Sequence, residues 1–259
     1  MGKIIAVANQ KGGVGKTTTA VNLSACLAQS GKNTVTIDID PQGNTTSGLG
    51  INKHALKHTV YEMLLGECHF EDTKMATNID CLSALPSNVE LAGAEIELIG
   101  YDRREFLLKN ILRDRKYLYD YMIIDCPPSL NILTINALTA ADSILVPIQC
   151  EFYALEGLSQ LLHTINLVKK RLNPSLEIEG VVFTMYDSRT NLSLQVVEEV
   201  KKHLPRDTYR SIIPRNVRLS EAPSHGMPIT LYDPKSKGAE AYILLAKEVI
   251  TNNEKYALL

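Results

Sequence analysis

Residues 8–19 read Ala-Asn-Gln-Lys-Gly-Gly-Val-Gly-Lys-Thr-Thr-Thr, and this stretch predicts the fold of the chain around it. It follows an apolar run at 4–7 and leads into apolar residues at helical spacing over 20–28. That order indicates a strand, a glycine-rich loop and a helix. The glycines let the backbone turn tightly and point several N–H groups inward, and the helix adds the positive end of its dipole. We therefore predict a phosphate-binding loop.

The residue types in this loop suit a nucleoside triphosphate with magnesium. Lys16 would neutralise the β- and γ-phosphates, and the hydroxyl of Thr17 would ligate Mg²⁺. The loop departs from the common pattern G-x-x-x-x-G-K-[ST], because Gln10 replaces the first glycine and an additional lysine, Lys11, precedes the others. The alternative is a plain glycine turn, which Gly-Lys-Thr between a strand and a helix disfavours. The predicted nucleotide-binding residues here are Lys11, Gly12, Gly13, Val14, Gly15, Lys16, Thr17 and Thr18.

Two further strands are expected to end in carboxylates beside this loop. Residues 34–40 form an apolar run that ends in Asp38 and Asp40, before a turn at 41–44. Side chains at the carboxyl ends of parallel strands face the ligand crevice. Asp40 is therefore predicted to hold an attacking water or to sense Mg²⁺, and Asp38 to support the magnesium shell or the strand end. The alternative for Asp40 is a capping residue before a turn.

The second such strand lies at 121–125 and ends in Asp125, before Pro127 and Pro128. An apolar strand ending in aspartate is the Walker B arrangement, in which Asp125 would hold Mg²⁺ through water opposite Thr17. The alternative is again an end-capping aspartate. The predicted metal-site residues are Thr17, Asp40 and Asp125.

Strands and helices alternate along the rest of the chain. Helices are expected at 59–65, 107–112, 130–140, 154–172 and 192–204, and strands at 79–84, 143–148 and 178–185. This alternation predicts a doubly wound α/β fold, a mostly parallel sheet with helices on both faces. Since no linker or internal repeat interrupts it, we expect residues 1–259 to form a single P-loop ATPase domain.

Composition and charge limit the classes of protein to which this chain can belong. The net charge of −2 means that any DNA binding must come from a local patch. The sequence contains no run of about 18 apolar residues, so no transmembrane helix is predicted. The first strand is expected to begin too early to leave room for a signal peptide. The five cysteines show no C-x-x-C or zinc spacing, which favours reduced thiols in the cytosol.

The segment K-G-G-V-G-K-T-T at 11–18 resembles the deviant Walker A box of ParA/MinD-class ATPases, and the whole chain resembles the ParA/Soj partitioning ATPases. The resemblance implies that Lys11 is a signature lysine, which reaches across an ATP-bound sandwich homodimer to the partner's phosphates. It also makes D-x-D-P-Q-G-N at 38–44 the switch I segment and the loop after Asp125 switch II. The residues expected to be catalytic are then Lys11, Lys16 and Asp40.

The resemblance also suggests a base-binding loop at 213–217, which in relatives lies against the adenine. The alternative is an ordinary turn from strand to helix. The predicted nucleotide-binding residues of this part of the chain are Met185, Pro214, Arg215 and Asn216.

Residues 186–219 carry a local basic excess, including Arg206, Arg210 and Arg215. Charge alone favours a solvated helix face over 192–204. The resemblance instead implies sequence-independent binding of double-stranded DNA by Arg189 and Arg218, which needs only charge and reach. Lys201 and Lys202 complete the predicted DNA-binding set.

The implied function is a cytoplasmic, nucleoid-associated ATP switch for chromosome or plasmid segregation. ATP would favour the DNA-binding dimer, and a ParB-type centromere-binding protein would stimulate slow hydrolysis. Three alternatives stay open: a MinD-like membrane-positioning ATPase, a P-loop carboxylate-activating enzyme that needs a second substrate, and a non-hydrolysing scaffold. The last helix, expected over 238–259, has balanced charges and Asn252-Asn253 in its pattern, so no membrane binding is expected.

Overall fold

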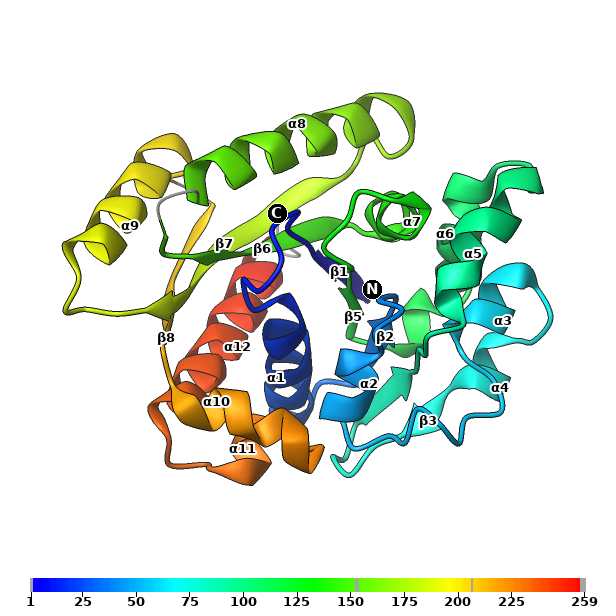
Figure 1. The fold of residues 1–259 in the computed structure, drawn as a ribbon, viewed down its shortest axis with the longest axis horizontal. Helices are drawn as coiled ribbons and strands as arrows, with labels where there is room; N and C mark the ends of the chain where they lie inside the picture. Colours follow the sequence, from blue (N-terminus) through cyan, green and yellow to red (C-terminus); the bar gives the residue numbers. More distant parts are fainter. Residues whose placement is uncertain (1, 152–153, 206, 257–259) are drawn as a thin grey trace.

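The strands form one sheet, in the order β3-β4-β2-β5-β1-β6-β7-β8 (Figure 1). The computed structural model describes residues 2–151, 154–205 and 207–256. All neighbouring strands are parallel except β3 and β4. The bounds are β1 Lys3–Val7, β2 Thr34–Asp38, β3 Met75–Ala76, β4 Leu82–Leu85, β5 Tyr121–Asp125, β6 Ser143–Gln149, β7 Glu177–Tyr186 and β8 Thr208–Pro214. The predicted fold class is confirmed.

Helices cover both faces of the sheet, because successive residues of its central strands are buried on opposite sides. Ile4 and Ala6 of β1 pack with helices α3 to α9, whereas Ile5 and Val7 pack with α1 and α10 to α12 (Figure 1). The helix α2 packs beside α1 on this second side. The α-helices are α1 Lys16–Gln29, α2 Asn44–Gly48, α3 Val60–Leu65, α4 Phe70–Thr73, α5 Leu91–Glu97, α6 Leu107–Arg113, α7 Ile132–Ala140, α8 Ala154–Arg171, α9 Asn191–His203, α10 Val217–Glu221, α11 Ile229–Tyr232 and α12 Lys237–Tyr256. Short 3-10 helices lie at Leu98–Gly100, Arg104–Phe106, Lys116–Leu118 and Ala222–His225.

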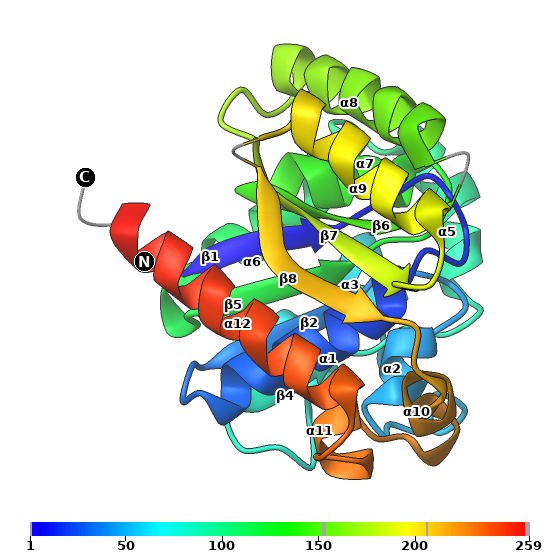
Figure 2. The same cartoon turned by 90° about the vertical axis from the view of Figure 1, so that its left-hand side faces the viewer.

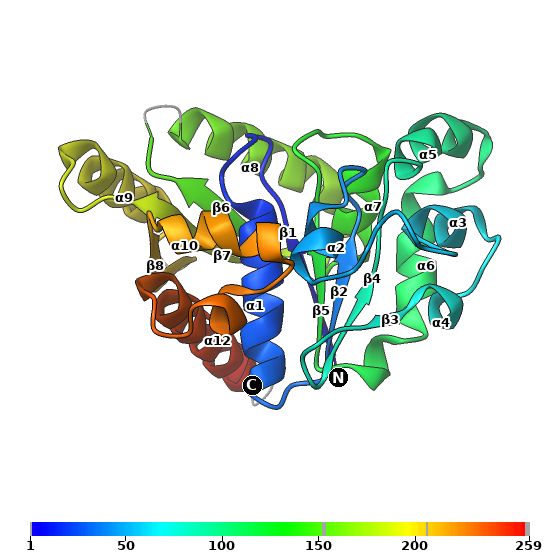
Figure 3. The ribbon, with the colours of Figure 1, turned by 60° about the horizontal axis from the view of Figure 1, so that its bottom comes forward.

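The last helix lies along the β8 edge of the sheet and beside α1 (Figures 2 and 3). One side of α12 is buried there, including Tyr242, Leu245 and Val249. Among the described residues, no helix has the length and apolar character needed to cross a bilayer.

The strand expected at 79–84 was placed too early. Leu82 N donates to the carbonyl of Ile79, so residues 79–82 form a turn, and Cys81 has a φ of 63°. A left-handed residue cannot continue an extended strand, and β4 therefore begins at Leu82.

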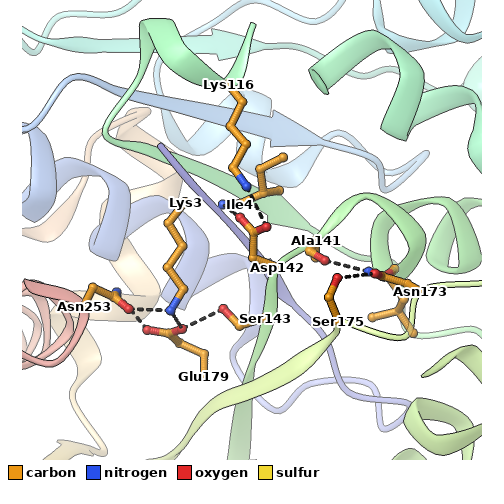
Figure 4. Close-up of polar contacts among 11 residues, drawn as sticks. Lys3, Ile4, Lys116, Ala141, Asp142, Ser143, Asn173, Ser175, Glu179 and Asn253 are labelled. Atoms are coloured by element: carbon orange, nitrogen blue, oxygen red, sulfur yellow. Dashed lines mark hydrogen bonds and ion pairs between the residues drawn. The ribbon is translucent and has the colours of Figure 1, made fainter. Parts of the chain in front are cut away.

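A polar network ties α12 to the amino-terminal ends of the strands (Figure 4). The carboxylate of Glu179, whose side chain is 3% exposed, lies 2.6 Å from Lys3 Nζ. It also accepts hydrogen bonds from Ser143 Oγ, Tyr209 OH and Asn253 Nδ2, at 2.6, 3.2 and 3.0 Å. This network lies at the end of the sheet opposite the predicted phosphate loop.

Candidate nucleotide-binding site

The phosphate loop connects the end of β1 to the start of α1, as predicted. Gly13 and Gly15 have φ values of 73° and 88°, a conformation that glycine adopts without strain. Lys16 is buried, and its ammonium donates to the carbonyl of Lys11 at 3.0 Å. Burial lowers the pKa of Lys16, although the charge of Asp125 opposes this shift. The arrangement therefore places a desolvated cation inside the loop, where a phosphate would replace its carbonyl partner.

Neighbouring strands hold this loop in place. Asn9 Nδ2 donates to the carbonyl of Pro147 at 2.8 Å, and the Asn9 side-chain oxygen accepts from Lys11 N at 3.0 Å. Thr184, at the end of β7, donates its hydroxyl to the carbonyl of Val14 at 2.8 Å. Nothing in the sequence selects Asn9 or Thr184, because the carbonyls of Pro147 and Val14 to which they donate are more than a hundred residues away.

Of the predicted magnesium ligands, Thr17 and Asp125 are in direct contact, and Thr45, which was not predicted, joins them. Thr17 Oγ1 and Thr45 Oγ1 both donate to Asp125 Oδ2, at 2.8 and 2.7 Å. The other oxygen, Oδ1, is buried and has no hydrogen-bond partner among the described residues. Burial, followed by the charge of Asp38, raises the pKa of Asp125 to about 8. Since Mg²⁺ prefers oxygen ligands and an unsatisfied carboxylate oxygen is already present, these residues fit the ion.

Asp38 and Asp40 have different surroundings. Register places Asp38 directly opposite Asp125. Asp38 accepts hydrogen bonds from Asp40 N at 3.2 Å and from the N and Oγ1 of Thr46 at 2.8 and 2.7 Å. Of its two predicted roles, this favours support of the strand end. Asp40 uses Oδ1 to accept from Gln42 N at 2.9 Å, so it is incorporated in a local turn while lying beside the phosphate loop.

A cavity of about 450 Å³ adjoins the loop and contains the predicted base-binding residues. Met185 lies there with a φ of 50°, an unusual conformation for a residue with a side chain. The hydroxyl of Tyr242, another lining residue, lies 3.2 Å from Thr19 Oγ1 and so connects α12 to α1. The cavity is lined by Gly15, Thr18, Thr184, Met185, Ile213, Pro214, Arg215, Asn216, Val217, Leu219, Ser220, Pro223 and Tyr242. The structure therefore brings both predicted nucleotide-binding segments to one place.

Lys11 extends away from the loop. Its ammonium forms a partly exposed ion pair with Glu151 at 3.0 Å. Within one chain, the predicted signature lysine is thus held by a carboxylate at the end of β6.

The four predicted DNA-binding residues do not form one cluster. Arg189 and Arg218 follow the ends of the parallel strands β7 and β8, so they lie at the same edge of the sheet as the phosphate loop. Lys201 and Lys202 are in the last turn of α9, about 15 Å further along that helix from its start. The prediction of one DNA-binding set did not include this separation, because the spacing of charges in the sequence does not show which end of the helix faces the phosphate loop. Arg206 lies outside the described residues.

Three of the four predicted DNA-binding residues form ion pairs with acidic side chains close to them in the sequence. Arg189, 84% exposed, makes two hydrogen bonds to the Asp187 carboxylate, at 2.9 and 2.7 Å. Arg218 pairs with Glu221 at 2.8 Å. Lys202 likewise pairs with Glu199 at 3.0 Å. The local basic charge is therefore smaller than a count of lysines and arginines suggests.

Comparison with known proteins gives a consistent result. A family model described as an AAA domain matches residues 2–178. The chain is 61% identical to the sporulation initiation inhibitor protein Soj of Bacillus subtilis, over 97% of this chain and 100% of that protein. It is 54% identical to the chromosome partitioning protein ParA of Myxococcus xanthus, over 96% of this chain and 88% of that protein. The solved structure of cobyrinic acid a,c-diamide synthase from Mycobacterium smegmatis, with bound ATP analog and magnesium, matches with a TM-score of 0.85 and 38% identity. That match covers 98% of this chain and 96% of the synthase.

Proposed function

The chain belongs to the ParA/Soj family of chromosome-partitioning ATPases, and from this we propose that it is an ATP-dependent switch that binds and releases DNA. One observation carries the proposal. Asp125 accepts hydrogen bonds from Thr17 of the phosphate loop and from Thr45 of the segment that follows Asp40. The residues that would bind nucleotide and those that would respond to it therefore share one buried carboxylate.

ATP and Mg²⁺ are the ligands that these residues suit. The loop N–H groups and Lys16 would bind the phosphates, and the cavity beside Met185 and Asn216 would hold the base. Thr17 and Asp125 would hold Mg²⁺, with Asp40 nearby. Bound there, the ion supplies positive charge that neutralises the β- and γ-phosphates.

Hydrolysis would need two further groups. Asp40 would orient the attacking water. Lys11, once released from Glu151, would reach the phosphates of a second chain in the ATP-bound dimer and stabilise charge that develops during phosphoryl transfer. Because Lys11 of each chain would first have to leave Glu151, the dimer would hydrolyse ATP slowly, as a switch requires. A ParB-type partner would accelerate this hydrolysis.

DNA binding would use Arg189 and Arg218. Both are exposed, but both are paired with carboxylates. A phosphate must therefore compete with Asp187 and Glu221, and single chains would bind weakly. Pairing two chains would double the number of phosphate contacts, which makes DNA binding steeply dependent on the dimer. Such a protein would act in the cytoplasm, associated with the nucleoid.

The likeness to a diamide synthase favours one competing function, an ATP-dependent enzyme that activates a carboxylate. The greater identity to Soj and ParA supports partitioning instead. A membrane-positioning role is less well supported, since the apolar side of α12 is buried against the sheet and α1. That side would have to leave the core before it could enter a lipid surface.

An ATPase assay with purified protein, Mg²⁺ and plasmid DNA, but no carboxylic acid or amide donor, tests the proposal. We expect slow ADP formation that Lys16→Ala abolishes together with ATP-dependent dimerisation. Asp40→Ala should instead form a dimer that persists with ATP. Hydrolysis that strictly requires a small-molecule co-substrate would contradict the proposal, as would sedimentation with liposomes but no retention on DNA.

A further inference from the structure

A series of buried hydrogen bonds connects the segments that carry Asp40, Thr46 and Ser87. Thr46, in α2, donates its backbone N–H and its hydroxyl to Asp38 Oδ2, at 2.8 and 2.7 Å. Ser87, in the segment after β4, donates its N–H to Thr46 Oγ1 at 2.9 Å. Its own hydroxyl donates to the backbone carbonyl of Asp40 at 2.9 Å. Thr46 and Ser87 are both fully buried.

Hydrogen bonds hold both backbone polar groups of Asp40, its N–H and its C=O. Its N–H donates to Asp38 Oδ1 at 3.2 Å, and its C=O accepts from Ser87 Oγ and from Gly43 N, both at 2.9 Å. Asp38 and Ser87 are both bonded to the hydroxyl of Thr46. That hydroxyl therefore connects the two groups that hold Asp40, and uses both its donor and its acceptor capacity to do so.

The packing around Asp40 leaves little room for movement. Gly43 has a φ of 61°, and a Cβ at this position would lie 2.7 Å from the Ser87 carbonyl oxygen. The Asp40 turn and the Ser87 loop are therefore in close contact, and a displacement of one must move the other.

We propose that Thr46 and Ser87 are positioning residues for Asp40: they hold its backbone so that its carboxylate meets the attacking water in the correct place. The inference rests on the role proposed above for Asp40. Neither residue lines the base cavity or belongs to the phosphate loop, so their loss should lower turnover and leave ATP affinity intact. Positional errors of this kind cost rate because phosphoryl transfer depends on alignment.

The test compares Thr46→Val with Thr46→Ser. Valine keeps the shape but leaves Ser87 N–H without an acceptor and removes one donor to Asp38, whereas serine keeps the hydroxyl. We expect Thr46→Val and Ser87→Ala to lower the rate constant of single-turnover ATP hydrolysis about tenfold or more. ATP dissociation constants should stay within about threefold of wild type, because no phosphate contact is lost. Thr46→Ser should restore most of the rate.

Thr36→Val is a matched control. Thr36 is buried in β2, two residues before Asp38, and its hydroxyl has no hydrogen-bond partner among the described residues. Its replacement should leave turnover unchanged, which separates the network from a general effect of removing a buried hydroxyl.

Three results would overturn the inference: wild-type turnover in Thr46→Val, an equal loss in Thr46→Val and Thr46→Ser, or an equal loss in Thr36→Val. If Thr46→Val does not fold, wild-type turnover in Ser87→Ala overturns the inference in the same way. Asp40→Ala is measured in parallel. Normal hydrolysis by that variant contradicts the proposed role of Asp40 itself, whereas an inactive Asp40→Ala beside an active Thr46→Val rejects only the positioning role.

Discussion

Replacing Glu179 with alanine should destabilise the protein without changing its affinity for ATP. The Glu179 carboxylate accepts from four donors at the amino-terminal edge of the sheet, Lys3, Ser143, Tyr209 and Asn253. Figure 4 shows its contacts with Lys3, Ser143 and Asn253. The substitution leaves the Lys3 ammonium and the Tyr209 hydroxyl without this partner. It also breaks the connection from β7 to Asn253 near the end of α12.

The magnitude follows from burial. Removing one partner of a buried ion pair costs about 3–5 kcal/mol, and the low end applies because the Lys3 side chain is 27% exposed. A loss of about 3 kcal/mol in a chain of this size corresponds to a fall in Tm of about 6–12 °C. Calorimetry, or circular dichroism during heating, measures the shift, and ATP binding is measured well below the lower Tm.

Lys32→Ala is the matched control, because Lys32 also connects the body of the protein to α12. Its ion pair with Glu254 is 3.0 Å long, with side chains 29% and 62% exposed. Exposed pairs contribute about 0–1 kcal/mol, so this variant should melt close to wild type. A Tm of Glu179→Ala within about 2 °C of wild type, or an equal loss of stability in both variants, would contradict a stabilising role for this network.

Other substitutions test the site directly. Thr184→Val leaves the buried carbonyl of Val14 unpaired, which should weaken ATP binding about fivefold to tenfold in calorimetric titration; unchanged affinity would show that the loop is held by other contacts. Asp187→Asn should strengthen DNA retention, because it frees Arg189 from a carboxylate whose pKa that arginine lowers; equal or weaker retention would contradict a role for this arginine in phosphate binding. Burial raises the pKa of Asp125 to about 8, so the folded protein holds a proton there that the unfolded chain releases near its usual value of 3.8. Without nucleotide or Mg²⁺, the free energy of unfolding should therefore fall as pH rises from about 5 to 8, and Asp125→Asn should flatten that slope; an identical slope in both proteins would refute the assignment.

The sequence predicts the phosphate loop and Asp125 because their signals are local. A glycine-rich loop ending in Gly-Lys-Thr needs only the preceding strand and the following helix to define it. The sequence does not show which strands are neighbours, however, and it is the observed pairing of β2 with β5 that places Asp38 opposite Asp125. The alternation of short apolar runs and amphipathic segments predicts the strands β1, β2, β4, β5, β6 and β7, whereas β3 and β8 were not predicted.

The residues that hold the site could not be predicted, because their partners come from distant parts of the chain. Ser87 bonds to Asp40 across 47 positions, and Thr184 to Val14 across 170. A buried serine or threonine has the same sequence appearance as one that forms a local turn. Only the Thr45-Thr46 pair directly after the predicted switch loop gave a local signal that could have been used.

The basic excess of residues 186–219 also overstates the charge that the arginines can offer to DNA, because acidic residues lie next to them. Asp187 lies two residues before Arg189, and Glu221 lies three residues after Arg218. A spacing of three residues brings side chains into contact on a helix, and an aspartate in a turn bonds the backbone two residues further on, as Asp187 does with Arg189 N. The sequence contained this information, but a sum of charges over a segment discards it.

The most direct test of the account is retention of the wild-type protein on double-stranded DNA with ATP, with ADP and without nucleotide, across a series of salt concentrations. We expect retention only with ATP, and we expect it to weaken steeply as salt rises, because the dimer binds DNA through phosphates. Equal retention in all three states, or none in any, would show that the phosphate loop does not control DNA binding.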